Sequence, residues 1–400
     1  MNMNKSLTAV AVAGVIAMPM SQAQAQPEGW YGFIAAGIES SSISSTRAAG
    51  ARFTAGGTLA VSTDGSALSG LTPVADSSGN VFGPAAMFHT NTGDDGEGNT
   101  GMSDIAESRF GFGGSEDLGN GLEAMYGFEF GLSTSAFPGG GSVNQSVNIR
   151  NRLSYLGISG DFGSITIGQQ WGTLYEFMGW NIGRSVGHGY GAWYYHTGIF
   201  NQNAYGLRVS NSVQYTYGGG GYSDDPFTFR VEGVFDDTTY TSTGGDTDSK
   251  FLDSLSLAAA GTFDVGAGAI TINGLYQSEQ GTDGADNTLD TLGLGGRYAM
   301  GPLVVGLTYL QTDIDSGGVD QEPTSVHLMG QYDFGNGFTG RLAAGTVDGD
   351  DVIDDLDTNI AVSLEQALSS RTFVDVEYET IDYDNIGDES VFYAGLRHTF

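Results

Sequence analysis

The feature that most constrains the fold is an alternation of apolar with polar or small residues, which begins near residue 107 and continues to the end of the chain. In residues 122–130, LEAMYGFEF, every even-numbered position is apolar. The same period of two recurs in residues 207–217, 227–235, 303–309 and 326–334, while helical spacing is nearly absent. Because neighbouring side chains of a strand point to opposite faces, this period predicts an all-β fold whose strands have one apolar and one polar face.

A soluble β-sandwich alternates in the same way, but two features favour a transmembrane antiparallel β-barrel. The segments are long, close to the ~9–11 residues that a tilted membrane strand needs. Aromatic residues also end many of the apolar faces, as the interfacial girdles of membrane barrels do. These residues are Tyr126, Tyr215, Tyr217, Tyr276, Tyr298, Tyr309, Tyr332 and Tyr378.

The connections between these segments alternate in length, which predicts short periplasmic turns at one end of the barrel and long external loops at the other. The short connections are residues 115–120, 160–163, 264–268, 299–302, 333–337 and 368–370. The long ones are residues 133–148, 171–206, 236–250, 279–287, 313–323, 347–355 and 382–388. Counting from Gly29 predicts about sixteen strands, an even number as in bacterial single-chain barrels. Residues 39–106 are too many for an ordinary loop, and we interpret them as an enlarged first external loop.

The amino terminus predicts export. Lys5 precedes a short apolar stretch, residues 7–18, and Ala23, Gln24 and Ala25 resemble a cleavage site. The apolar stretch is shorter than the ~20 residues that a membrane-spanning helix needs. We therefore expect residues 1–25 to be a signal peptide and residues 26–400 to form the barrel.

Composition excludes two functional classes. The chain has 47 Asp and Glu against 14 Lys and Arg, so we expect no nucleic-acid partner, because the phosphate backbone would be repelled. No Gly-x-Ser-x-Gly motif is present, and the histidines have no metal-binding spacing, so we expect no enzyme. The histidines are His89, His188, His196, His327 and His398. The absence of Cys excludes disulfides and fits an exported protein.

Acidic clusters in residues 94–97, 313–322 and 348–355 supply the oxygen ligands that Ca²⁺ and Mg²⁺ prefer. Their spacing does not match the EF-hand loop, and we favour solvated, mutually repelling loops as the explanation. We therefore expect no cofactor and retain a divalent cation at the external loops as an alternative.

The basic residues fall within or at the ends of the predicted strands, and most lie opposite the apolar face. Arginine facing lipid costs ~2–4 kcal/mol near the bilayer midplane, so this face is expected to line the lumen. The alternation places on this face Arg109, Arg208, Arg230, Arg297, Arg341 and Arg397, together with Glu123 and Glu129. Arg150 and Arg152 share one face of their strand, but the alternation in that segment is less clear. Opposed arginines and carboxylates would set the ion preference of a pore.

Several motifs resemble those of the Gram-negative general porins, and the resemblance covers most of the chain after residue 26. Residues 110–125, FGFGGSEDLGNGLEAM, and 151–168, NRLSYLGISGDFGSITIG, resemble a strand–turn–strand unit each. Residues 368–372 resemble the penultimate turn, and residues 393–400 the final strand. Two departures put the solute preference in doubt: Gln169 stands where many relatives have Arg, and residues 171–206 lack a Pro-Glu-Phe-Gly-like segment.

The resemblance implies a homotrimer in the outer membrane of a Gram-negative bacterium, surrounded by lipid and lipopolysaccharide, that lets small hydrophilic solutes and ions diffuse passively. It also implies that the assembly machinery of the outer membrane reads the final strand, which ends at Phe400.

The resemblance further implies that residues 171–206 form a third loop that folds into the lumen and narrows it. Glu176 is its single acid, and its aromatic residues include Tyr175, Trp180 and Trp193. These rings either pack the loop against the wall or form a track that stacks sugars or other ring-bearing solutes. A substrate-specific channel and a surface adhesion protein, which would use residues 39–106, therefore remain as alternatives.

Overall fold

The computed structural model describes residues 29–44, 99–103, 108–132, 149–180, 189–197, 207–221, 223, 225–235, 252–280, 288–316, 319–350, 355–384 and 387–400. The predicted signal peptide, residues 1–25, lies outside the described residues, as does most of the predicted first external loop, residues 39–106. The adhesion hypothesis therefore rests on a segment whose larger part is not described.

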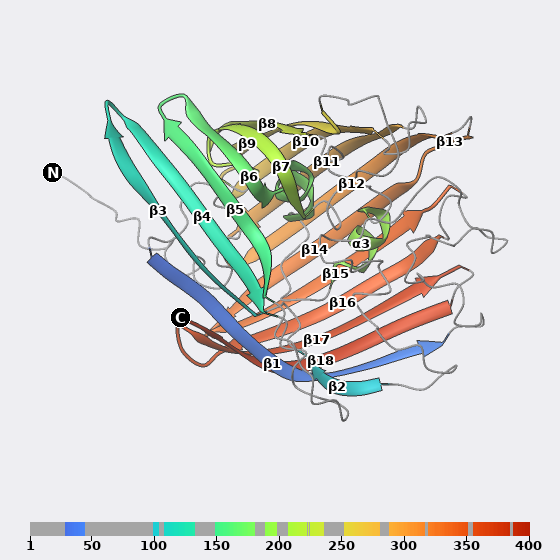
Figure 1. The fold of residues 1–400 in the computed structure, drawn as a ribbon. Coiled ribbons are helices and arrows are strands. Elements are labelled where there is room, and N and C mark those ends of the chain that lie inside the picture. Colours follow the sequence, from blue (N-terminus) through green and yellow to red (C-terminus); the bar gives the residue numbers. More distant parts are fainter. Residues whose placement is uncertain are drawn as a thin grey trace.

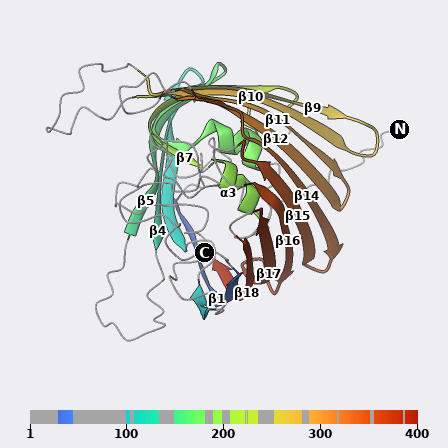
Figure 2. The same cartoon turned by 90° about the vertical axis from the view of Figure 1, so that its right-hand side faces the viewer.

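The described chain forms one closed antiparallel β-barrel (Figures 1 and 2). Strand β1 pairs with β18 along one edge and with β2 and β3 in succession along the other, while β13 and β14 pair in succession with β12. Since β2 and β13 extend the positions of β3 and β14, the eighteen strands occupy sixteen positions, as predicted. The strands are β1 (Gly29–Ser44), β2 (Asn99–Ser103), β3 (Arg109–Gly119), β4 (Leu122–Leu132), β5 (Ile149–Gly160), β6 (Gly163–Trp171), β7 (Arg208–Tyr217), β8 (Thr228–Val234), β9 (Ser254–Asp264), β10 (Ala269–Gln280), β11 (Thr288–Met300), β12 (Leu303–Ser316), β13 (Val319–Gln321), β14 (Thr324–Gly335), β15 (Phe338–Asp348), β16 (Leu356–Ala367), β17 (Thr372–Tyr383) and β18 (Gly387–Thr399).

The predicted short turns are present, and local sequence explains their shape. Asn120 and Gly121 alone connect β3 to β4, with φ of 56° and 77°, and Asn336 and Gly337 connect β14 to β15 with φ of 54° and 75°. Asn-Gly is the pair that tolerates two successive positive φ angles, as a tight hairpin with the twist of its strands requires. These hairpins therefore determine which residues of the adjoining strands face the lumen.

The outer face of the wall is apolar and the enclosed inner face is polar, which is the reverse of the arrangement in a soluble protein. Leu156 is 63% exposed and Ile167 59% exposed on the outer face, whereas Glu129 is 5% exposed on the inner one. No helix among the described residues is long and apolar enough to cross a membrane. Burial alternates along each strand, and it places four of the arginines on the enclosed inner face: Arg109, Arg230, Arg341 and Arg397.

An irregularity in the pairing of β4 with β5 explains why the alternation of the two faces is unclear near Arg150 and Arg152. Glu129 pairs with Leu153, whereas the next residue, Phe130, pairs with Asn151, so Arg152 is an extra residue in the ladder. Such a β-bulge shifts the alternation by one position. Arg152 consequently remains on the lumen side, where it is 5% exposed.

Two helical segments of the third loop lie inside the ring of strands. They are the π-helix η2 (Tyr175–Gly179), which contacts β9, β10 and β11, and the α-helix α3 (Gly191–Thr197), which contacts β14, β15 and β16. Figure 2 shows α3 surrounded by the wall. The third loop therefore folds inward, as expected, and occupies part of the lumen.

Candidate functional site

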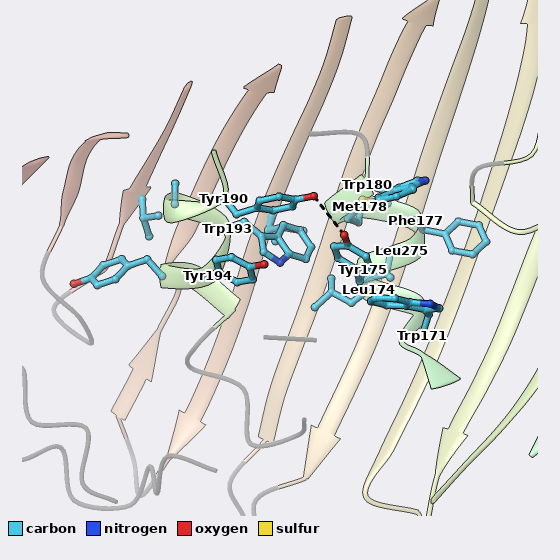
Figure 3. Close-up of a cluster of buried hydrophobic side chains, with 14 of the residues drawn as sticks. Trp171, Leu174, Tyr175, Phe177, Met178, Trp180, Tyr190, Trp193, Tyr194 and Leu275 are labelled. Carbon is cyan, nitrogen blue, oxygen red and sulfur yellow. Dashed lines mark hydrogen bonds between the residues drawn. The ribbon is translucent and has the colours of Figure 1, made fainter. Parts of the chain in front are cut away.

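The third loop and the inner face of the wall together form a buried aromatic cluster (Figure 3). Trp171 stacks on Tyr175, with ring centroids 5.2 Å apart, and Tyr190 stacks on Tyr194 at 5.4 Å. The hydroxyls of Tyr175 and Tyr190 are 3.5 Å apart and join the two stacks. The structure thus brings together the two helical parts of the loop through their rings.

The predicted aromatic residues are part of this packed core. The ring centroids of Trp180 and Trp193 lie 5.8 Å and 6.3 Å from that of Tyr175. Trp193 is fully buried, and Trp180 and Tyr175 are each 6% exposed. Rings in this state contribute packing, whereas a track that stacks solutes needs an accessible ring face.

The first anchor of the loop joins η2 to the wall on β8 and β12. Glu176 forms an ion pair with Arg230, and both side chains are almost completely buried. The backbone N–H of Thr173 donates to Glu232 at 3.3 Å, and the hydroxyl of Thr308 donates to the carbonyl of Met178 at 2.9 Å. Burial raises the pKa of Glu176 to about 7, although the neighbouring Arg230 opposes this shift. The guanidinium of Arg230 therefore contacts the buried carboxylate of Glu176 and also stabilises the charge of Glu232.

The second anchor joins α3 to β16 and β17. The N–H groups of Gly191 and Ala192 donate to Glu379 at 3.0 Å and to the side-chain oxygen of Asn359 at 3.2 Å. The amide of Asn359 also donates to Glu379 at 2.7 Å. These wall residues satisfy the first N–H groups of the helix, which have no partner within it.

Space for α3 depends on a glycine in the wall. A side chain at Gly345 of β15 would place its Cβ 2.7 Å from the Cβ of Ala192. We expect Gly345→Val to push α3 away from the wall, at a cost of about 1–3 kcal/mol typical of overpacking, and to alter single-channel conductance. Gly330→Val on β14 is the matched control, since a Cβ there meets nothing within 4 Å. Equal conductance of both variants and the parent would contradict the role of Gly345 in the packing of α3 against the wall.

Two ionic networks line the wall outside the loop anchors. In the first, Glu129 accepts a hydrogen bond from Arg152 at 2.6 Å, forms an ion pair with Arg109 at 3.7 Å and accepts from the hydroxyl of Tyr31. In the second, the guanidinium of Arg397 contacts Glu365 at 2.6 Å and Asp375 at 3.1 Å, and Arg341 contacts Glu365 at 3.7 Å.

The remaining predicted lumen residues are less tightly enclosed. Arg150, Arg208 and Arg297 are half-buried. The guanidinium groups of Arg208 and Arg152 lie 5.5 Å and 5.9 Å from the ring centre of Trp171, at the start of the third loop. This places Arg208 at the root of the third loop.

Glu123 lies away from the constriction, at the periplasmic end of β4. It borders a cavity of about 620 Å³ together with Asp117, Asp161 and Asp225. Glu123 therefore lies near the turns that join β3 to β4 and β5 to β6, in a different part of the wall from the third-loop anchors. Phe400 is half-exposed at the end of the wall, where its N–H donates to the carbonyl of Gly32.

Sequence reasoning missed the wall residues that position the loop, chiefly Asn359 and Thr308, and the carboxylate of Glu365 in the second ionic network. Each stands at an inward position of its strand, which is the one signal available from the sequence. The described residues contain no group of three or more His, Asp or Glu side chains arranged to hold a metal ion. The carboxylate of Asp350 instead accepts the N–H of Glu322, which joins two of the acidic loops.

A closed barrel with an apolar outer face, a charged inner face and an inward loop defines a channel of the outer membrane. Residues 8–386 match the family model described as Gram-negative porin, and the chain belongs to that family. It is accordingly a porin of the Gram-negative outer membrane and not an enzyme.

Two curated relatives match parts of the chain. It is 32% identical over 137 residues to a chitoporin of Vibrio furnissii, a match that covers 34% of this chain and 36% of the relative. It is 27% identical over 235 residues to an outer membrane porin protein of Bordetella pertussis, covering 57% of this chain and 49% of that protein. The chain thus spans less than half the length of the curated relatives it matches.

Solved structures agree with the fold over nearly the whole chain. The anion-selective porin from Comamonas acidovorans is 17% identical, with 93% of this chain and 98% of that chain covered and a TM-score of 0.62. OmpF of Salmonella typhi, in complex with daunomycin, is 13% identical with coverage of 93% and 97% and a TM-score of 0.58. A trimer form of OmpT from Vibrio cholerae is 16% identical, with coverage of 94% and 100% and a TM-score of 0.56.

Proposed function

We propose that the protein lets small hydrophilic solutes and ions diffuse passively through the lumen. The observation that carries this proposal is the inner wall, which is polar and charged and is narrowed by a loop anchored to both sides of the lumen. A sixteen-stranded barrel is wide enough to enclose an aqueous channel. Nothing in this function requires bond-making chemistry.

Purified protein added to a planar lipid bilayer is expected to give stepwise increases in conductance. The current should grow in proportion to salt concentration, because ions cross through water. A barrel that inserts, as judged by a heat-dependent shift on a gel, and never conducts would overturn the proposal.

A channel specific for ring-bearing solutes is the second candidate. Its support is the stacked row of rings from Trp171 to Tyr194 and the partial identity to a chitoporin. Against it stands the burial of every ring in that row. Saturable block of the ion current by one class of sugar would favour this candidate, and a block that depends on solute size alone would favour simple diffusion.

We also propose that three copies assemble as a homotrimer, like the trimer form of OmpT from Vibrio cholerae. Support for this assembly comes from an aromatic patch on the outer face of β1, β3 and β4. Trp30 is 71% exposed and lies 5.1 Å from Phe112, which stacks on Phe128 at 5.1 Å. Large exposed aromatic surfaces are enriched at protein interfaces.

Native mass measurement in mild detergent is expected to give three barrel masses. Trp30→Ala with Phe112→Ala should lower the temperature at which the trimer dissociates. Leu294→Ala with Leu307→Ala is the control pair, on the outer face of β11 and β12. A single barrel mass, or equal effects of the two pairs, would count against this interface.

A further inference from the structure

Two buried histidines, one on α3 and one on the strand it contacts, interact electrostatically, and the proposed diffusion does not require them. His196 belongs to α3 and His327 to β14, and they are 0% and 3% exposed. His196 shares a hydrogen bond with the hydroxyl of Thr312 at 2.9 Å, and His327 shares one with the hydroxyl of Ser325 at 2.9 Å. These hydroxyl partners carry no charge.

The surroundings of this histidine pair disfavour a positive charge. Trp193 lies edge-on over His327, with ring centres 6.0 Å apart, and is itself fully buried. A charge on His196 also acts directly on His327, so that two imidazolium ions would repel each other.

Charged groups on the other elements around α3 lie away from the pair. On β17, Glu379 holds Gly191 at the opposite end of the helix, and β16 contributes the neutral Asn359 there. On β15, Gly345 faces Ala192, and Arg341 bonds to Gln331 and Glu365. On β12, Thr308 and Thr312 face the loop.

We propose that His196 and His327 form an acid-sensitive latch, which holds α3 against the lumen wall at neutral pH and releases it when the pH falls. The latch bears on solute flow only if the channel conducts as proposed, but its release is measurable without conduction. Release would alter the lumen, because α3 carries Tyr194 of the aromatic cluster and follows directly on Tyr190.

The expected size of the effect follows from linkage between protonation and docking. Burial lowers the pKa of His196 to about 3, from an ordinary value of 6.5. A base whose pKa is depressed on docking stabilises the docked loop fully above pH 6.5, and this contribution is lost as the pH falls towards 3. At about pH 4.5 the ratio of docked to released helix should therefore fall by about 100-fold from His196 alone.

The chain has no Cys, so a single introduced thiol reports on release. Thr197→Cys places a thiol of similar size at a fully buried position of α3, and Ser370→Cys places a reference thiol in an exposed periplasmic turn. The labelling rate at residue 197, divided by that at residue 370 at the same pH, removes the pH dependence of thiol reactivity. This ratio should rise by about 100-fold or more between about pH 7.5 and about pH 4.5.

In the background of His196→Gln with His327→Gln, the rise should shrink to within about twofold, whereas His398→Gln, an exposed control, should retain it in full. Should the double variant fail to show the heat-dependent gel shift of a folded barrel, His196→Gln alone should reduce the rise by about 100-fold. A labelling ratio that does not change with pH in the parent would overturn the latch. An equal rise in the histidine variants would overturn it too, and would assign the release to carboxylates such as Glu379.

Discussion

Replacing Arg230 with Met is expected to weaken the docking of the third loop by about 3–5 kcal/mol, the usual cost of removing one partner of a buried ion pair. Arg230 is 1% exposed, and it neutralises Glu176 in direct contact and stabilises the charge of Glu232. Without Arg230 both carboxylates remain buried and lose the positive charge that stabilises them. The first anchor of the loop should then open, while the hydrogen-bonded ladder of the barrel remains.

The measurement is the temperature at which the folded form disappears from an unheated gel, together with the noise of single-channel currents. Arg230→Met should lower this temperature by several degrees and make the current unsteady. Arg371→Met, in an exposed periplasmic turn, is the matched control. The double variant Arg230→Met with Glu176→Gln should recover part of the loss, because Glu232 retains its hydrogen bonds from Gln214 and Thr173. Equal behaviour of Arg230→Met and Arg371→Met would contradict the anchor.

This variant should also depend on pH in a defined direction. A carboxyl whose pKa is raised on docking stabilises the docked loop fully below its ordinary pKa, and this contribution is lost as the pH rises through the raised value. For Glu176 the window runs from 4.5 to about 7 in the parent. Loss of the guanidinium of Arg230 raises the pKa of the docked Glu176 further and so extends this pH window upward. Arg230→Met should therefore weaken docking of the third loop more at about pH 8 than at about pH 5.

Sequence alone was sufficient for the barrel because strand faces are local properties. Residues 122–130 alternate, and Asn120 with Gly121 turns the chain, without reference to any distant residue. The bulge at Arg152 was not visible, since it is defined by the partner strand through the pairing of Glu129 with Leu153.

The anchors of the third loop could not be predicted for the same reason. Glu176 meets Arg230 on β8, and Gly191 meets Glu379 on β17, although these residues are far apart in the sequence. Inward polar positions around the whole barrel offer many possible partners for each loop residue. The aromatic composition of the loop left open whether its rings pack against the wall or stack solutes. Which wall residues the rings contact depends on how the loop crosses the lumen.

The net charge of −33 suggests strong cation selectivity, yet we expect only a mild cation preference. Selectivity is set where a channel is narrow, which we propose is at the root of the third loop. Arg109, Arg152 and Arg208 lie there around the carboxylate of Glu129. The acidic external residues concentrate cations at the mouth, an effect screened beyond ~10 Å at about 0.1 M salt. The cation preference should therefore fall as the salt concentration rises.

The measurement is the reversal potential across a KCl gradient at low and high salt. Arg208→Gln should increase the ratio of cation to anion permeability by about two- to fivefold at low salt, as expected for one charge several ångströms from the ion path. Arg371→Gln, at the periplasmic turn, should change it little. A strong cation preference of the parent that persists at about 1 M salt, where the screening length is only ~3 Å, would show that carboxylates line the narrow region. The arginines near Trp171 would then lie outside the ion path.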